Sequence, residues 1–266
     1  MFILRKNRIK TAVFTLIFTI FISASAAADD LVCGAYISKS GLDIADYEAL
    51  CGVKNSIYLI GVQKTYPKEK ILECYANGKI PMLIISRDIR FSSLPEIADA
   101  AGEYDLPMYI CIAGDTEYFK LCVGIFRARC KNIKFVQPVM LSDTDYEFVG
   151  CDYADYIAIT ATFTEKNRDV GSLYNAVEQA DVPVMLDLAV SRYSENGHQY
   201  TTFDAIKDLS YVYNIKTAFP DKLFGINYIN ITSGGRKFDV YGDKKIRTVY
   251  GGLVCKYGTE YGLNDF

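Results

Sequence analysis

The chain has 266 residues, with 29 lysines and arginines against 32 aspartates and glutamates, and a formal net charge of −3. An acidic chain without a block of basic residues argues against nucleic acid or an anionic membrane surface as its partner. The length suits one large domain, and no linker or low-complexity tract divides the sequence after its first 28 residues.

The first 28 residues have the order of a secretory signal peptide. Four basic residues lie among the first ten, the apolar run TAVFTLIFTIFIS follows, and SASAAA supplies small residues for cleavage after Ala26 or Ala28. The run is shorter than the ~20 apolar residues that a membrane span needs, and an uncleaved anchor helix is the alternative. We expect residues 1–28 to be removed and residues 29–266 to form an exported domain with 25 basic and 32 acidic residues, a net charge of −7.

After the first 30 residues, short apolar segments alternate regularly with longer polar segments. The expected strands lie at 31–38, 56–62, 80–86, 106–112, 133–139, 155–161, 182–188 and 223–229. The expected helices between them lie at 43–50, 68–76, 92–104, 116–130, 142–150, 170–180 and 203–219. Eight parallel strands with helical crossovers predict an α/β fold, a single (β/α)8 TIM barrel. Residues 233–257 alternate and contain a Gly-Asp turn, so we expect an irregular eighth unit with a β-hairpin-like tail and no eighth helix.

The sequence contains no sign of a cofactor or a metal site. No phosphate-binding glycine loop is present, and the eight cysteines match no zinc framework. Export would allow disulfides, but Cys111, Cys122 and Cys130 read equally well as small buried residues. The only histidine, His198, lies in a polar loop and without a GxSxG elbow it does not indicate a Ser-His-Asp triad.

Two early segments resemble those of a known enzyme family. The segments GAYISKSGLDIADYEALCG and TYPKEKILECYANGKIPMLIISRD are similar to the opening of mannanase-type retaining glycoside hydrolases with a (β/α)8 barrel. The likeness continues through PMYICIAGDTEY, DYIAITATF, PVMLDLAVS and LFGINYIN. The resemblance implies a barrel that hydrolyses a β-linked, mannan-type polysaccharide with two carboxyl groups, an acid/base after strand four and a nucleophile at strand seven.

The sequence departs from that family at the catalytic positions. The arginine position of strand four is Cys111, and the acid/base glutamate position is Asp115, with Glu117 two residues later. The nucleophile position falls nearest Leu188, with Asp187 one residue earlier, and one residue on a strand reverses the face. Asp115, Glu117 and Asp187 are the candidate catalytic residues.

Each catalytic candidate also has a structural interpretation. Asp115 and Glu117 would serve equally well as the N-cap and a first-turn acid of the fourth helix. Asp187 lies in an otherwise apolar strand, where a carboxylate must face a polar cavity or find a partner.

The remaining candidates are residues at strand ends, which gather at one rim of such a barrel. The chain has no tryptophan, so tyrosines would have to supply the flat surfaces that sugars contact. The candidate substrate-binding residues are Tyr36, Arg87, Asp88, Gln137, Thr160, Tyr228 and Asn230, and we expect Ser38, Arg87, Asp115, Gln137, Thr160 and Asn230 near one rim. Each of them is equally compatible with a plain rim residue.

Two functions remain open from the sequence. One is an exported glycoside hydrolase in which Asp115 or Glu117 protonates the leaving oxygen and Asp187 attacks. The other is a catalytically inactive barrel that binds glycans or a cell-surface partner. Two carboxyl groups facing each other at the barrel mouth would favour the enzyme, and one or none would favour the binding protein.

Overall fold

The computed structural model describes residues 31–38, 41–141, 148–164, 168, 170–190, 201–233 and 236–266. The expected signal peptide and His198 lie outside these residues. So does most of the helix expected at 142–150, of which only the last three residues are described, without helical structure.

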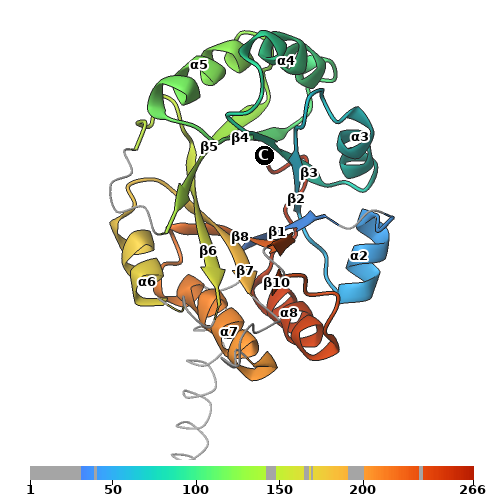
Figure 1. The fold of residues 1–266 in the computed structure, drawn as a ribbon, viewed down its shortest axis with the longest axis vertical. Coiled ribbons are helices and arrows are strands. Elements are labelled where there is room, and N and C mark those ends of the chain that lie inside the picture. The colour runs from blue at the N-terminus through green and yellow to red at the C-terminus, as the bar shows by residue number, and fades with distance from the viewer. Residues whose placement is uncertain are drawn as a thin grey trace, which may run out of the picture.

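Eight parallel strands close into a barrel in chain order, with β8 pairing β1 (Figure 1). The strands are β1 (Val32–Ile37), β2 (Ile57–Gly61), β3 (Ile80–Ile85), β4 (Met108–Ile112), β5 (Ile133–Met140), β6 (Tyr156–Phe163), β7 (Val184–Val190) and β8 (Leu223–Asn230). The helices are α2 (Ile44–Cys51), α3 (Lys68–Ala76), the short η1 (Phe91–Ser93), α4 (Leu94–Gly102), α5 (Thr116–Arg127), α6 (Val170–Gln179), α7 (Thr202–Ala218) and α8 (Lys244–Tyr257). The predicted (β/α)8 barrel is confirmed.

Side-chain alternation along the strands divides the core into two layers. Residues such as Leu59, Met82 and Met185 fill the barrel interior. Their neighbours along the chain, such as Leu83 and Leu186, pack outward against the helices, which surround the ring of strands in Figure 1. Both faces of each strand are therefore buried, which explains why the strand sequences are almost continuously apolar.

The eighth unit differs from the expectation. A hairpin is present, but it comprises only β9 (Thr232–Ser233) and β10 (Arg236–Lys237). The prediction that no eighth helix follows is wrong, because Lys244–Tyr257 form α8 with Asp243 as its N-cap. The buried side chains of Ile246, Tyr250, Val254 and Tyr257 recur at helical intervals. Packing against the barrel overrides the low helix propensity of two adjacent glycines in this segment.

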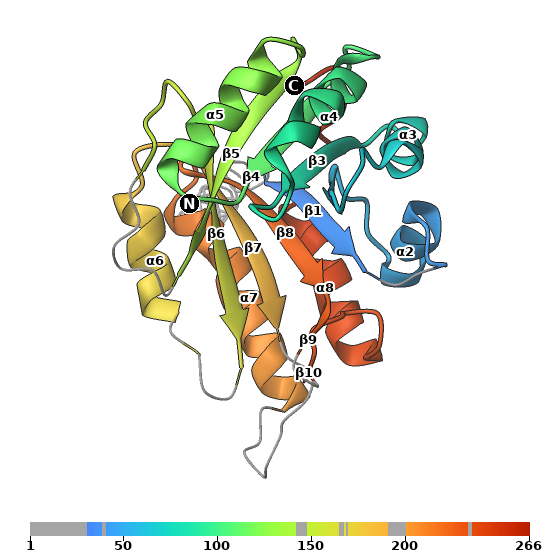
Figure 2. The same cartoon turned by 45° about the horizontal axis from the view of Figure 1, so that its top comes forward.

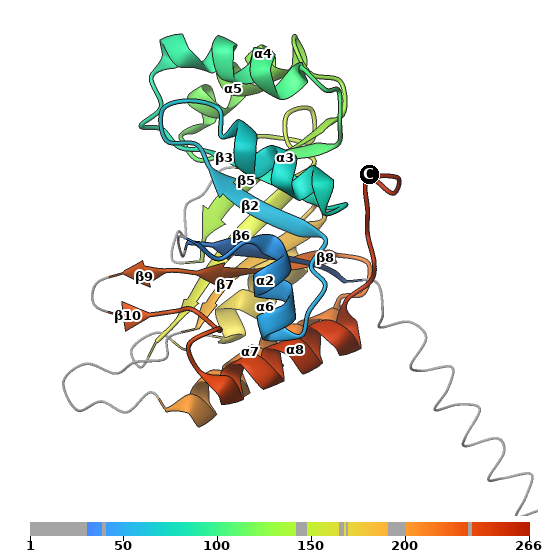
Figure 3. The same cartoon turned by 90° about the vertical axis from the view of Figure 1, so that its right-hand side faces the viewer.

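The residues after α8 close the amino-terminal end of the barrel. The Tyr261 amide donates to Ser56 Oγ at 3.1 Å, and Ser56 directly precedes β2. The Phe266 ring lies 5.0 Å from the Tyr109 ring inside the barrel. Figure 3 accordingly shows the chain end on the side opposite β9 and β10. Aromatic side chains therefore fill this end, and any site at the barrel axis must open at the other.

The carboxyl ends of the strands mark that other end. In Figure 2 the arrows of β6, β7 and β8 point toward the end where β9 and β10 lie. In (β/α)8 enzymes this face carries the active site. No helix in the described part of the chain is long and apolar enough to cross a membrane.

Candidate functional site

Three neighbouring strands carry a row of polar side chains into the barrel. Thr160 of β6 pairs in register with Asp187 of β7, which pairs with Asn227 of β8. Met185, two residues before Asp187, lies in the interior cluster, whereas Leu188 belongs to the outer layer. Since side chains alternate along a strand, Asp187 points inward and Leu188 outward.

Asp187 is the unusual acid of this row. Its side chain is buried, with 8% of the residue exposed, and the Asn227 side-chain amide donates to its Oδ1 at 2.9 Å. Burial raises the pKa of Asp187 from 3.8 to about 6, and the bond from Asn227 partly opposes that rise. Asp187 is therefore ionised at neutral pH but takes up a proton in mildly acidic solution.

The surroundings of Asp187 are closely packed. A Cβ atom at Gly34 of β1 would collide with Asn227 Oδ1 and would approach the Ile57 carbonyl oxygen to 3.0 Å. Cys111 of β4 also lies inside the barrel, and its pKa is raised by burial and further by the charge of Asp187. The polar row thus depends on Gly34, which leaves room for the Asn227 side chain.

Asn227 is the residue of this site that the sequence prediction missed. It lies in the apolar strand LFGINYIN, where a polar side chain indicates a partner in the same way as Asp187 does in VPVMLDL. The two residues lie 40 positions apart, and strand pairing joins them.

Asp115 and Glu117 occupy the positions of a helix start. Asp115 is the N-cap of α5, and its Oδ1 accepts a bond from the Tyr118 amide at 2.9 Å. Its Oδ2 pairs with Arg87 at 2.9 Å, and the two side chains are 52% and 71% exposed. Glu117 is an exposed residue in the first turn of α5. Arg87 and Asp115 therefore do meet at the rim, as an ion pair between the ends of β3 and β4.

Three of the proposed substrate-binding residues have structural partners within the protein. Gln137 faces outward from β5, because Val136 lies in the barrel interior, and its Oε1 accepts a bond from the Val149 amide at 3.1 Å. Tyr228 is fully buried, with its ring 5.2 Å from that of Tyr250 on α8.

Asn230 is the third of these residues and is also fully buried. Its amide nitrogen donates to the Tyr36 carbonyl oxygen at 3.0 Å and to Tyr47 Oη at 3.1 Å. Its side-chain oxygen accepts a bond from the Val240 amide at 3.0 Å. Asn230 therefore connects the end of β8 to β1, α2 and the segment before α8.

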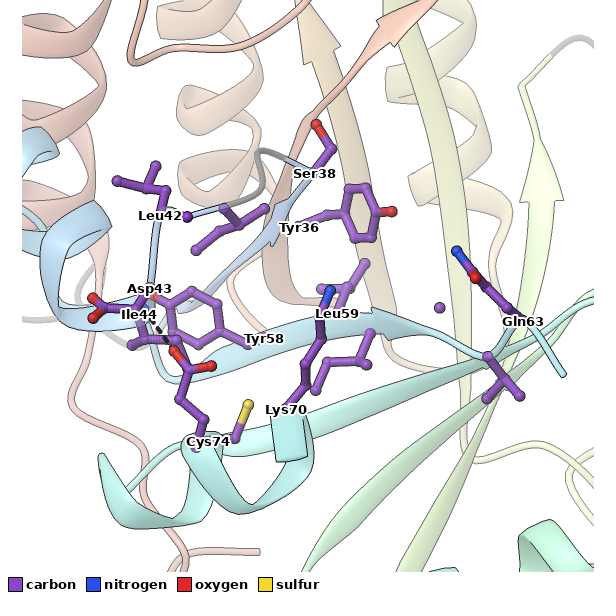
Figure 4. A pocket seen from close by; sticks show the side chains of 16 residues that line it. Tyr36, Ser38, Leu42, Asp43, Ile44, Tyr58, Leu59, Gln63, Lys70 and Cys74 are labelled. Atoms are coloured by element: carbon purple, nitrogen blue, oxygen red, sulfur yellow. Dashed lines mark hydrogen bonds between the residues drawn. The ribbon is translucent and has the colours of Figure 1, made fainter. Parts of the chain in front are cut away.

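A cavity of about 570 Å³ lies at the carboxyl ends of β1 and β2, bordered by α2 and α3 (Figure 4). The half-buried Tyr36 and the exposed Ser38 reach it from β1, and the exposed Gln63 reaches it from the residues after β2. In Figure 4 the ends of the Tyr36 and Gln63 side chains point toward one another. The cavity has the size of a typical small-molecule site and combines apolar walls with a few polar groups.

Of the remaining candidates, Thr160 belongs to the polar row, and Asp88 is an exposed residue after β3. No three histidine, cysteine, aspartate or glutamate side chains gather as a metal site within the described ranges. All eight cysteines lie in those ranges as free thiols. Cys111, Cys122 and Cys130 are buried, which agrees with their interpretation as small core residues.

No protein-family model matches the sequence, and no curated protein does. Solved structures do resemble it. An endo-β-1,4-mannanase double mutant from Cellulomonas fimi has a TM-score of 0.61 at 10% identity, over 91% of this chain and 76% of that chain. β-Glucuronidase 2 from Bacteroides uniformis has a TM-score of 0.64 at 8% identity, over 89% of this chain and 36% of that chain.

The chain shares the fold of these glycoside hydrolases. GH26A from a Muricauda species adds a TM-score of 0.51 at 12% identity, over 85% of this chain and 94% of that chain. Because the identities are so low, the likeness shows the fold alone, and function has to be argued from the site.

Proposed function

We propose that this barrel binds a glycan at its carboxyl-terminal mouth. The observation that carries the proposal is the cavity at the ends of β1 and β2, where the Tyr36 ring lies beside Ser38 and Gln63. Sugar rings present apolar C–H faces and hydroxyl groups at once, so an aromatic ring flanked by hydrogen-bonding groups fits them. The glycoside hydrolases that share this fold make a carbohydrate the first ligand class to test.

Binding without hydrolysis is the function that the carboxyl groups favour. Retaining hydrolysis needs two carboxyl groups about 5 Å apart across the sugar. Asp187 is the one acid that the described strands point into the barrel, and Asp115 already uses both of its oxygens. No second acid of the described strands therefore accompanies Asp187 in the barrel interior.

Hydrolysis is the second candidate, and one observation favours it. Asp187 lies on β7, the strand that carries the nucleophile in the family that the sequence resembles, and it points inward with a pKa of about 6. A buried carboxyl group with a pKa raised toward neutrality is typical of catalytic acids and bases.

Binding and hydrolysis are tested with one panel of soluble glycans. The panel contains β-mannan, β-glucan, xylan and oligosaccharides with glucuronic acid, and each is assayed by calorimetry and by the release of reducing ends. We expect binding without release, and about tenfold weaker binding in Tyr36→Ala, since the lost ring contact corresponds to about 1.4 kcal/mol. Tyr211→Ala, which removes an exposed ring on α7, is the matched control and should bind like the wild type.

The outcomes separate the two candidates. A wild-type protein that binds none of these glycans overturns the proposal. Release of reducing ends that disappears in Asp187→Asn, with glycan binding retained, establishes the hydrolase in place of the non-catalytic binder.

A further inference from the structure

The charged residues around the cavity at the ends of β1 and β2 are not equivalent. Three of them line it: Asp43, Lys70 and Glu73. Asp43 Oδ1 accepts a bond from the Asp46 amide at 2.7 Å, as the N-cap of α2. Glu73 Oε1 accepts a bond from the Ile44 amide at 2.9 Å, which is the dashed line in Figure 4. Both acids are therefore oriented by, and partly neutralised by, the start of α2.

Lys70 has no such partner. Its ammonium group forms no ion pair or hydrogen bond with any residue in the described ranges, and its side chain is exposed. In Figure 4 the side chain points from α3 into the cavity, toward the side where Tyr36 lies. Arg87 at the same end of the barrel differs, because Asp115 pairs with it at 2.9 Å.

Lys70 lies in the first turn of α3. It is the third residue of the helix, whose N-cap Pro67 supplies no side-chain cap. The uncapped amides of a first turn carry partial positive charge, and anions bind favourably near them. Glu69, the acid of that turn, is not among the residues that line the cavity.

We propose that the cavity selects a sugar unit that carries an anionic group, which pairs with the Lys70 ammonium while the sugar ring lies against Tyr36. This inference rests on the proposed glycan binding and adds the class of ligand. The cavity offers one unpaired cation beside the Tyr36 ring, and the two acids that also line it already accept bonds from amides of α2. The strength of such a pair depends on the salt concentration, because the group is exposed.

Matched pairs of oligosaccharides test the inference. Tetramers of β-1,4-mannuronate and β-1,4-mannose differ only at carbon 6, and so do tetramers of β-1,4-glucuronate and β-1,4-glucose. We expect the wild type to bind the acidic member of at least one pair about tenfold more tightly than the neutral member at low salt, the size of one hydrogen bond to a charged group. A 6-sulfated β-1,4-glucose tetramer shows whether any anion suffices or a carboxylate is required.

Variants assign the preference to Lys70. Lys70→Met should bind the acidic tetramer about as weakly as the neutral one and lose the salt dependence, and Lys70→Arg should retain most of both. Lys207→Met, which removes an exposed lysine of α7 outside the cavity, should bind like the wild type.

The failure of this inference is distinguishable from the failure of the proposed function. Binding of neutral tetramers with no preference for the acidic members overturns the inference and leaves glycan binding in place. An acidic preference that survives in Lys70→Met also overturns it. A wild-type protein that binds neither the panel nor any tetramer overturns both.

Discussion

Replacement of Asp187 by asparagine should make the stability of the barrel less dependent on pH. Burial raises the pKa of the Asp187 carboxyl group from 3.8 to about 6 in the folded protein. The bond from Asn227 can persist in the variant, because an asparagine side-chain oxygen accepts it as a carboxylate oxygen does. The variant therefore removes the titration while it preserves the hydrogen bond and the volume.

The sign and size of this pH dependence follow from proton linkage. Well below the unfolded pKa of 3.8 the carboxyl group is protonated in both states, and the stabilisation from its higher folded pKa is fully present. As the pH rises through about 6, the folded protein has to hold a buried charge that the unfolded chain holds in water, and this stabilisation is lost. A difference of about 2 pKa units corresponds to about 3 kcal/mol.

Urea unfolding of the wild type and Asp187→Asn between pH 4 and pH 7 measures this difference. Relative to the variant, the wild type should lose most of this stabilisation, about 2.5 kcal/mol of unfolding free energy, across that range. Asp181→Asn, at an exposed position, is the control for general effects of a lost charge. If the difference between the wild type and Asp187→Asn is constant from pH 4 to pH 7, Asp187 is not a buried acid with a raised pKa.

Two further predictions concern stability. Gly34→Ala should lower the unfolding free energy by about 1–3 kcal/mol, because its Cβ would collide with Asn227. Gly61→Ala, with no atom within 4 Å of the new Cβ, should change the unfolding free energy little. Equal losses of thermal stability in the two variants would contradict the close packing around Gly34. Thr201→Ala should cost about 1 kcal/mol in denaturant unfolding, because it removes the capping box with Asp204 at the start of α7, and Thr201→Ser should restore it. A serine variant as unstable as the alanine variant would show that the cap hydrogen bond is not the cause.

Local signals in the sequence were sufficient for most of the architecture. Apolar segments of strand length alternate with helical periods, and eight such units have few alternatives to a closed parallel barrel. Helix starts were equally readable, since an N-cap such as Asp115 acts on amides only a few residues away. The exception was α8, where β-forming residues and two glycines obscured a helical spacing that becomes stable only when it packs on the barrel.

Tertiary structure decided which polar residues share a site. The inward direction of Asp187 and the outward direction of Leu188 depend on strand pairing, because a shift of one residue exchanges the faces. The same alternation turns Tyr228 away from the barrel axis, although its position in the sequence was compatible with a sugar site. Lys70 became a candidate only when α3 was placed beside the ends of β1 and β2. The periods of helices and strands depend on sterics and hydrogen bonds between residues that are close in the sequence. Contacts between residues tens of positions apart form only when the barrel closes.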